Sequence, residues 1–122
     1  MQVIKAAEGE TVERGAEPVF RGGPVWARPL ASAATGAEFN SGVVQFAAGA
    51  RTNLHTHTSD QLLYVVAGIG KVATRDEEHV ISAGDFVLIP AGEAHWHGAG
   101  DTGSPMSHLM VTRAGSQTEV VE

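Results

Sequence analysis

Four histidines stand in two pairs, and within each pair a single residue separates the two imidazoles. His55 and His57 lie in LHTHTSDQ, and His95 and His97 lie in EAHWHG. In an extended strand, side chains two residues apart point to the same face and stand about 7 Å apart along the backbone. Each pair can therefore turn two imidazoles toward one point, and imidazole is a common metal ligand. The spacing predicts a metal site shared by two strands.

The side-chain amide of Gln61 ends the first stretch, where a carboxylate would be the stronger ligand. The chain has no cysteine, so any metal must be bound by nitrogen and oxygen. An amide oxygen can bind a hard or borderline cation, although more weakly than a carboxylate. Three imidazoles and an amide leave the charge of a divalent ion uncancelled, which makes the ion a stronger Lewis acid. The alternative is that Gln61 only hydrogen-bonds nearby and three histidines hold the metal alone.

Two further histidines are candidates for proton transfer. His97 shares the face of His95 and is expected to project into the same cavity, within reach of a bound substrate. His108 lies in MSHLMV, where Met106 and Met110 share its face, so it would be a polar group in an apolar wall. A general base would suit that position. The alternative for both residues is a purely structural role.

Other polar residues near the histidines are weaker candidates. His79 lies in the charged stretch RDEEHVI and is expected to be solvated. Asp60 precedes Gln61, and strand alternation predicts that it faces outward rather than replacing the missing acid. Arg51 could meet an anionic substrate, but its place in the loop stretch GART favours exposure to solvent.

Short strands must position these residues. The 15 glycines fall between short runs rich in Val, Leu, Ile and Phe, and no long helical period is present, which is typical of an all-β protein. Many short strands with regular turn signals indicate a sandwich or a barrel, and a barrel removes exposed sheet edges. The expected strands cover residues 3–6, 24–30, 38–48, 61–68, 70–75, 77–83, 85–90, 93–100 and 106–113.

Two stretches resemble the paired motifs of the cupin superfamily. In residues 49–68, the pattern G-x5-H-x-H-x3-Q-x6-G matches the first motif apart from its acid, which is Gln61 here. In residues 84–99, the pattern G-x5-P-x-G-x2-H matches the second motif, although Ala99 stands at its final Asn position. The resemblance implies one cupin domain over residues 1–122, folded as a small double-stranded β-barrel of the jelly-roll type.

The resemblance also implies a metal centre in the mouth of the barrel. It places one divalent ion per chain on His55, His57, Gln61 and His95. The stretches GARTNLHTH, PAGEAHWHGA and MSHLMV are similar to a narrower group, the bacterial cupin hydroxynitrile lyases. In that group, a manganese ion binds the oxygen of a cyanohydrin or aldehyde, and histidines matching His97 and His108 lie in the cavity. Iron, nickel, zinc and copper are the alternatives for the metal.

Three functions remain open at this point. The first is a metal-dependent lyase that acts on a small cyanohydrin or aldehyde, with His97 or His108 as the acid and base. The second is a dioxygenase similar to the quercetinases, in which three histidines leave coordination positions open for substrate and dioxygen. The third is a non-enzymatic cupin that binds a small molecule. An amide in place of a carboxylate favours Lewis-acid chemistry and therefore the lyase.

Length and charge limit the partners. A chain of 122 residues suits one domain, and its net charge of −6 disfavours binding to nucleic acid or to anionic membranes. No stretch has the apolar character of a signal peptide or a membrane span, which predicts a cytoplasmic protein. The resemblance to cupins implies a homodimer or a higher homo-oligomer, with residues 24–30 as a candidate swapped or edge strand.

Overall fold

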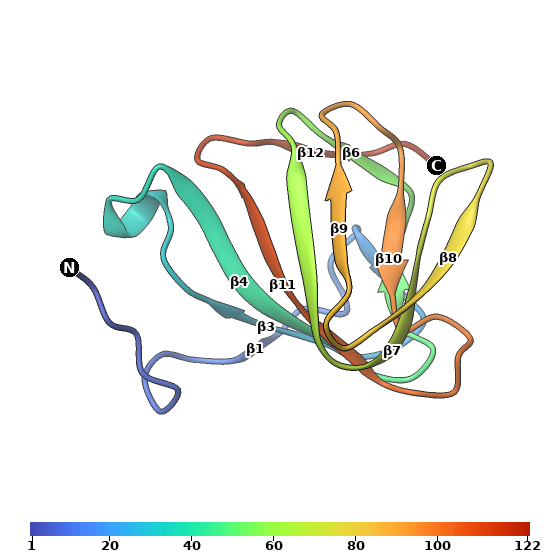
Figure 1. The fold of residues 1–122 in the computed structure, drawn as a ribbon, viewed down its shortest axis with the longest axis horizontal. Helices are drawn as coiled ribbons and strands as arrows, with labels where there is room; N and C mark the ends of the chain where they lie inside the picture. The colour runs from blue at the N-terminus through green and yellow to red at the C-terminus, as the bar shows by residue number, and fades with distance from the viewer.

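The computed structural model describes all residues, 1–122, and it is built almost entirely from antiparallel strands (Figure 1). The strands are β1 (Val12–Glu13), β2 (Phe20–Arg21), β3 (Val25–Pro29), β4 (Phe39–Phe46), β5 (Arg51–Thr52), β6 (His55–His57), β7 (Gln61–Ala73), β8 (Glu78–Ser82), β9 (Phe86–Ile89), β10 (Trp96–Gly98), β11 (Met106–Arg113) and β12 (Thr118–Val120). One short 3₁₀ helix covers Ala33–Thr35. The prediction of an all-β protein is confirmed.

One large sheet curls upon itself to form the barrel. Its strands follow the order β1-β3-β4-β11-β7-β10-β5-β2, while β8 and β9 also pair with β7. Two strands stand apart from this sheet, because β6 pairs with β12 in a separate two-stranded ladder. The arrangement is the expected jelly-roll barrel, and it places the strand of His55 and His57 outside the main sheet.

Strand β7 joins the two sides of the barrel. Its first part pairs with β11 and β9, and its second part, from Ile69 onward, pairs with β8 and β10. In Figure 1, β7 descends beside β9, bends at the bottom and rises beside β8. Gly68 has a φ of 79°, and a Cβ there would lie 1.9 Å from the carbonyl oxygen of Pro105. Only glycine fits this bend. The two strands expected at 61–68 and 70–75 are joined across it into one continuous strand, β7.

The apolar core packs against the histidines. Ten buried residues form it: Val25, Phe46, Ala50, Leu63, Val65, Val72, Ile81, Ile89, Ala99 and Met106. The ring of Phe46 links this core to the histidines, because its centroid lies 6.0 Å from that of His97 and 5.4 Å from that of His108. The core therefore fixes the wall from which these two imidazoles project.

The expected strand at residues 3–6 is wrong. These residues have no strand partner, and the Arg28 guanidinium donates hydrogen bonds to the carbonyl oxygens of Lys5 and Glu8 instead. The short apolar run has the residue types typical of a strand, but it pairs with no other strand. Residues 24–30 do form a strand, β3, which pairs with β4 and β1 of its own chain.

The structure contains no helix with the length and hydrophobicity needed to cross a bilayer.

Candidate metal centre

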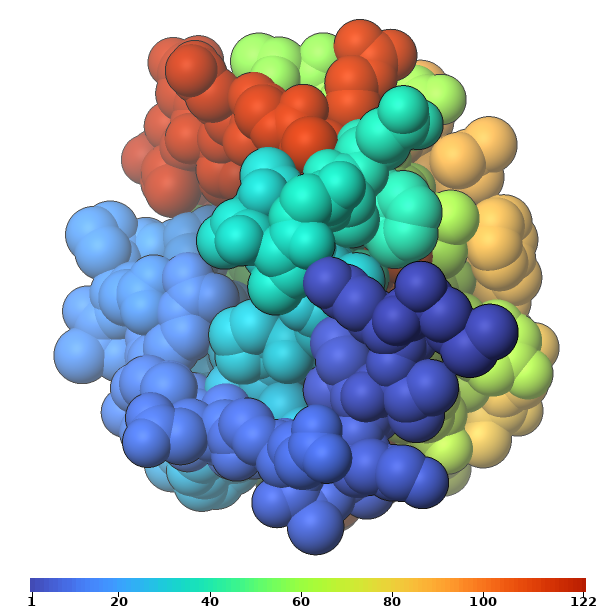
Figure 2. Space-filling view, turned by 90° about the vertical axis from the view of Figure 1, so that its left-hand side faces the viewer, coloured from blue at the N-terminus to red at the C-terminus, as the bar shows by residue number.

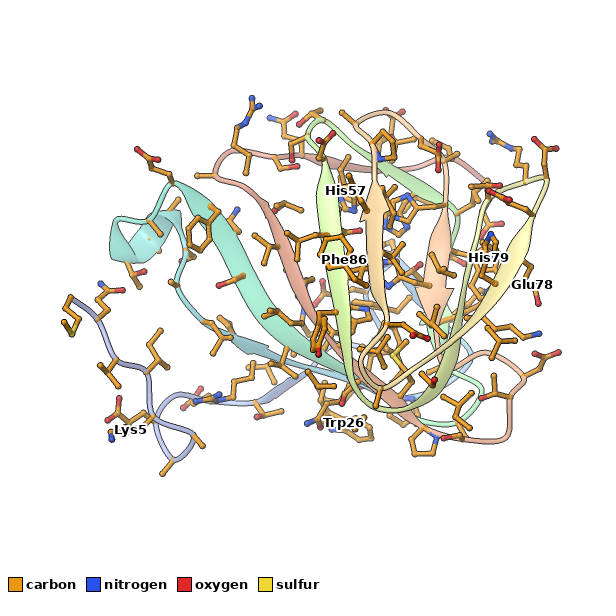
Figure 3. All side chains as sticks on the ribbon, viewed as in Figure 1. Lys5, Trp26, His57, Glu78, His79 and Phe86 are labelled. Carbon is orange, nitrogen blue, oxygen red and sulfur yellow. The ribbon has the colours of Figure 1, made fainter.

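Five of the six histidines gather inside the barrel, and all five are buried: His55, His57, His95, His97 and His108. They come from three regions of the chain, with β6 carrying one pair, β10 and the residue before it carrying the second, and β11 carrying the last. Figure 3 shows His57 near the upper end of the barrel and His79 on β8. His79 is exposed, and its ring lies 3.3 Å from the carboxylate of Glu77, as expected for a solvated residue.

His55 and His95 are joined through their backbones. The N–H of each donates to the carbonyl oxygen of the other, at 2.9 and 3.0 Å. Each ring also donates from Nδ1 to a carbonyl two residues earlier, His55 to Asn53 at 2.7 Å and His95 to Glu93 at 2.9 Å. A carbonyl can only accept, so Nδ1 holds the proton and Nε2 keeps its lone pair. Both rings therefore present a free Nε2, and their centroids are 4.3 Å apart.

His57 and Gln61 add two more potential ligands beside this pair. The His57 ring centroid lies 4.8 Å from that of His55, and its Nε2 is buried without a hydrogen-bond partner. The Gln61 Oε1 lies 3.1 Å from the His95 Nε2. Because Nε2 of a neutral His95 carries no proton, two acceptors face each other there, unless the amide rotates to donate through its NH₂. A cation bound by both atoms would satisfy this contact, so these residues fit a metal.

Burial keeps the imidazoles neutral. Desolvation lowers the pKa of His55, His57 and His108 to about 4 in each case, and it also lowers the pKa of His95. His97 is shifted furthest, because desolvation and the neighbouring imidazoles all lower its pKa. Neutral imidazole is the form that binds a metal, so the cluster is ready to do so near pH 7.

His97 and His108 form a hydrogen-bonded pair. The His108 Nε2 lies 2.9 Å from the His97 Nδ1, so one ring donates and the other accepts. The remaining nitrogens, His97 Nε2 and His108 Nδ1, are buried without a partner. A bulge lies beside this pair, because Val65 faces His108 across the sheet but Ala67 faces Ser107, which leaves one extra residue in β7. Bulges often re-aim a side chain near a functional site.

The structure gathers the predicted ligands and adds another to them. One ring nitrogen from each of His55, His95 and His97 lies within 4.8 Å of the other two. The His97 ring also stacks on His95 with 5.6 Å between centroids. His57 lies beside this triad, so His57 and His97 are both candidates for the third imidazole.

The histidines open onto a cavity of about 540 Å³. Its wall includes His55, His57, Gln61, His97 and His108, while Phe20, Val44 and Met110 provide apolar surface. This volume falls within the range of small-molecule sites. His95 does not line the cavity, but its ring packs against those of His55 and His97, which do.

The mouth of the cavity is framed by segments outside the two motifs. An Arg14–Glu17 ion pair with contacts of 2.6 and 2.7 Å lines it, as does Thr118 from β12. Figure 2 shows the blue and cyan N-terminal third of the chain across this end of the barrel, with the red C-terminal part above it. Neither segment carries a motif, so the sequence alone does not identify these residues as part of the site.

Two weaker candidates point away from the cluster. Asp60 is exposed, and its Oδ1 accepts a hydrogen bond from the backbone N–H of Ala91 at 3.0 Å. The Arg51 guanidinium lies over the Trp96 ring, 4.1 Å from its centroid, and neither side chain lines the cavity. The structure therefore brings neither residue to the histidines.

Comparisons with known proteins agree with this architecture. The sequence is 43% identical over 110 residues to the (R)-mandelonitrile lyase of Granulicella tundricola, covering 88% of this chain and 82% of that protein. A shorter match to the acireductone dioxygenase of Granulibacter bethesdensis is 36% identical over 52 residues, which is 39% of this chain and 29% of the relative.

The structure is similar to that of a cupin-like protein from Thermotoga maritima, with a TM-score of 0.83 and 29% identity. That likeness covers 92% of this chain and 86% of the other. The profile of the Cupin domain matches residues 42–112, which include both motifs, all the histidines and Gln61. The chain belongs to the cupin family.

Proposed function

We propose that this cupin is a metal-dependent lyase that cleaves or forms a small cyanohydrin, in the manner of a hydroxynitrile lyase. One observation carries the proposal: the hydrogen-bonded His97–His108 pair stands beside the free imidazole nitrogens in the same small-molecule cavity. The 43% identity to a mandelonitrile lyase supports the choice of reaction.

The metal would be held by His55, His57, Gln61 and His95. One divalent ion per chain is expected, with manganese as the first candidate and iron, nickel, zinc and copper as the alternatives. When bound, the ion would supply a Lewis acid for the substrate oxygen. The neutral amide of Gln61 supports this role, because it leaves more positive charge on the ion than a carboxylate would.

The His97–His108 pair would move the proton. Cleavage of a cyanohydrin removes the hydroxyl proton, breaks the bond to the nitrile carbon and releases an aldehyde with hydrogen cyanide. If the His97 Nδ1 donates to the His108 Nε2, the His97 Nε2 is a free base that can accept the hydroxyl proton. The same proton can then pass to the departing cyanide, so that the pair returns to its starting state.

The test begins with metal analysis of the purified protein, followed by an assay on mandelonitrile with and without dioxygen. We expect release of benzaldehyde and cyanide that depends on the metal and is unchanged when dioxygen is removed. Failure to turn over mandelonitrile, together with oxygen uptake on catechol-like or flavonol substrates, would overturn the proposal.

A dioxygenase is the second candidate. The partial match to an acireductone dioxygenase favours it, and a cluster of imidazoles is compatible with oxygen chemistry. Its weakness is that the match covers only 29% of that relative. Metal binding with no turnover in either assay would favour the third alternative, a non-enzymatic binding protein.

We further propose that the chain forms a homodimer or a larger homo-oligomer, as the cupin resemblance implies, while a cytoplasmic location stays a prediction. Sedimentation velocity of the purified chain measures the mass of the assembly directly. A monomer at micromolar concentration would contradict the proposal.

A further inference from the structure

We propose that Thr118, on the C-terminal strand β12, is a positioning residue that orients His57 for metal binding. The inference rests on the proposed metal site and assigns a role to a segment that lies beyond the matched cupin residues 42–112. It is carried by one contact, in which the Thr118 Oγ1 lies 2.9 Å from the His57 Nδ1.

The C-terminal strand holds the strand of His55 and His57 in place. Because β6 lies outside the main sheet, β12 is the strand that pairs along its whole length, with Thr118 opposite His57 and Val120 opposite His55. Bonds at both ends extend this ladder. The backbone of Leu54 bonds to Val121 and to the Glu122 carboxylate, and the backbone of Thr58 bonds to Gln117.

His57 differs from its neighbours in how its ring is held. The Nδ1 atoms of His55 and His95 bond to backbone carbonyls two residues earlier in their own strands. The Nδ1 of His57 depends on a side chain 61 residues away. A threonine in a strand has a restricted χ1, so its hydroxyl occupies a defined place.

The direction of this hydrogen bond decides whether His57 can be a ligand. If the threonine oxygen accepts, Nδ1 carries the proton and the buried, unpartnered Nε2 keeps its lone pair for the metal. If the hydroxyl donates, the proton lies on Nε2 and blocks ligation. The other two rings avoid this ambiguity, because a carbonyl cannot donate. We infer that the Thr118 oxygen accepts in the metal-bound protein.

The experiment compares three variants by metal affinity rather than by activity. Thr118→Val keeps the branched shape and places a methyl group where the hydroxyl was, whereas Thr118→Ser keeps the hydroxyl. Thr58→Val is the matched control, because the Thr58 Oγ1 accepts a bond from the Gln117 N–H at 2.9 Å and joins the same two segments without contacting a histidine. Affinity for Mn²⁺ is measured by competition with a chelator.

We expect Thr118→Val to weaken Mn²⁺ binding about 10-fold to 100-fold, the usual effect of losing such a partner. Thr118→Ser and Thr58→Val should bind within a few-fold of the parent protein. In addition, ¹⁵N NMR of the Zn²⁺-loaded parent should show His57 protonated at Nδ1. Equal loss in Thr118→Val and Thr58→Val would reduce the effect to strand pairing, and unchanged affinity in Thr118→Val would overturn the proposal.

Failure of the proposed function gives a different result. If the parent protein binds neither Mn²⁺ nor Zn²⁺, the metal site itself is wrong, and the role of Thr118 falls with it. If the parent binds metal but does not cleave mandelonitrile, the reaction is wrong while the Thr118 comparison still stands.

Discussion

Four of the five buried histidines, all except His57, fall into two groups that are held in different ways. His55 and His95 are fixed by backbone atoms, through their mutual bridge and through carbonyls in their own strands. His97 and His108 instead fix each other, through one bond between rings on two different strands. Backbone contacts survive most substitutions nearby, whereas a bond between side chains is lost when either residue changes. The first group is therefore suited to constant binding of an ion, and the second to moving a proton.

The largest effect should come from removing a ring that the backbone holds. His55→Ala deletes one free Nε2 at the centre of the cluster, so bound metal and mandelonitrile cleavage should both fall to background. Metal content is measured by inductively coupled plasma mass spectrometry after exhaustive dialysis.

His97→Ala is the matched comparison for this variant. It should retain most of the metal if His57 supplies the third imidazole, as we propose. Metal loss equal to that of His55→Ala would instead make His97 a ligand, and the distinction between the two groups would have to be redrawn.

Removing a ring from the second group should separate binding from catalysis. We expect His108→Ala to keep its metal but to lose about 10²-fold to 10⁴-fold in kcat, the usual contribution of a general acid or base. The reason is that His97 would lose its proton-sharing partner. Metal loss in this variant as severe as in His55→Ala would show that His108 is a ligand and would contradict the roles assigned here.

The sequence predicted the position of the first group better than the contacts of the second. The spacing of His55 and His57 and the matching spacing at His95 indicated a shared site, because side-chain alternation in a strand is a local property. The bond between His97 and His108 depends on the register of β10 and β11 with β7, including the bulge near Val65. Register across a barrel is set by distant pairings and cannot be read from either stretch alone.

The same limit applies to the fold. Long apolar runs with turn signals, such as those of β4, β7 and β11, were predicted because they carry their own pattern. The strands β1, β2, β5 and β12 have only two or three residues, and distant partners define them. Conversely, residues 3–6 carried a strand pattern and found no partner. Thr118 could not be singled out, because nothing in GSQTEVVE reveals that it faces His57.

Acid should act on both groups and more strongly on the second. Burial lowers the pKa of His55 and that of His108 to about 4, and it lowers the pKa of His97 much more strongly than that of His95, because the neighbouring imidazoles also act on His97. In the unfolded chain these imidazoles titrate near pH 6.5, so between pH 6.5 and 4 the unfolded state binds more protons than the folded state. The stability of the metal-free protein should be complete above pH 6.5 and fall below it, by about 1.4 kcal/mol per pH unit for each group that titrates.

Urea unfolding of the metal-free protein at several pH values measures this slope. In His108→Ala the slope between pH 6.5 and 4 should be smaller, because one buried group no longer titrates and the repulsion on His97 is relieved. An identical slope in the two proteins would mean that protonation of His108 does not contribute to the pH dependence of the free energy of unfolding, and it would contradict this prediction.

The smallest effect should come from changing the charge of Gln61, the proposed ligand beside His95. The Gln61 Oε1 lies 3.1 Å from the His95 Nε2, so Gln61→Glu would place an anionic oxygen at the same point. Affinity for Mn²⁺ should rise by about tenfold, because carboxylates bind such ions more tightly than amides. Cleavage of mandelonitrile should slow several-fold, because the carboxylate cancels part of the charge that polarises the substrate.

Gln61→Leu is the control, since it keeps the bulk and removes the oxygen. If neither variant changes the affinity, Gln61 serves only as a hydrogen-bond partner of His95, and three imidazoles hold the ion alone.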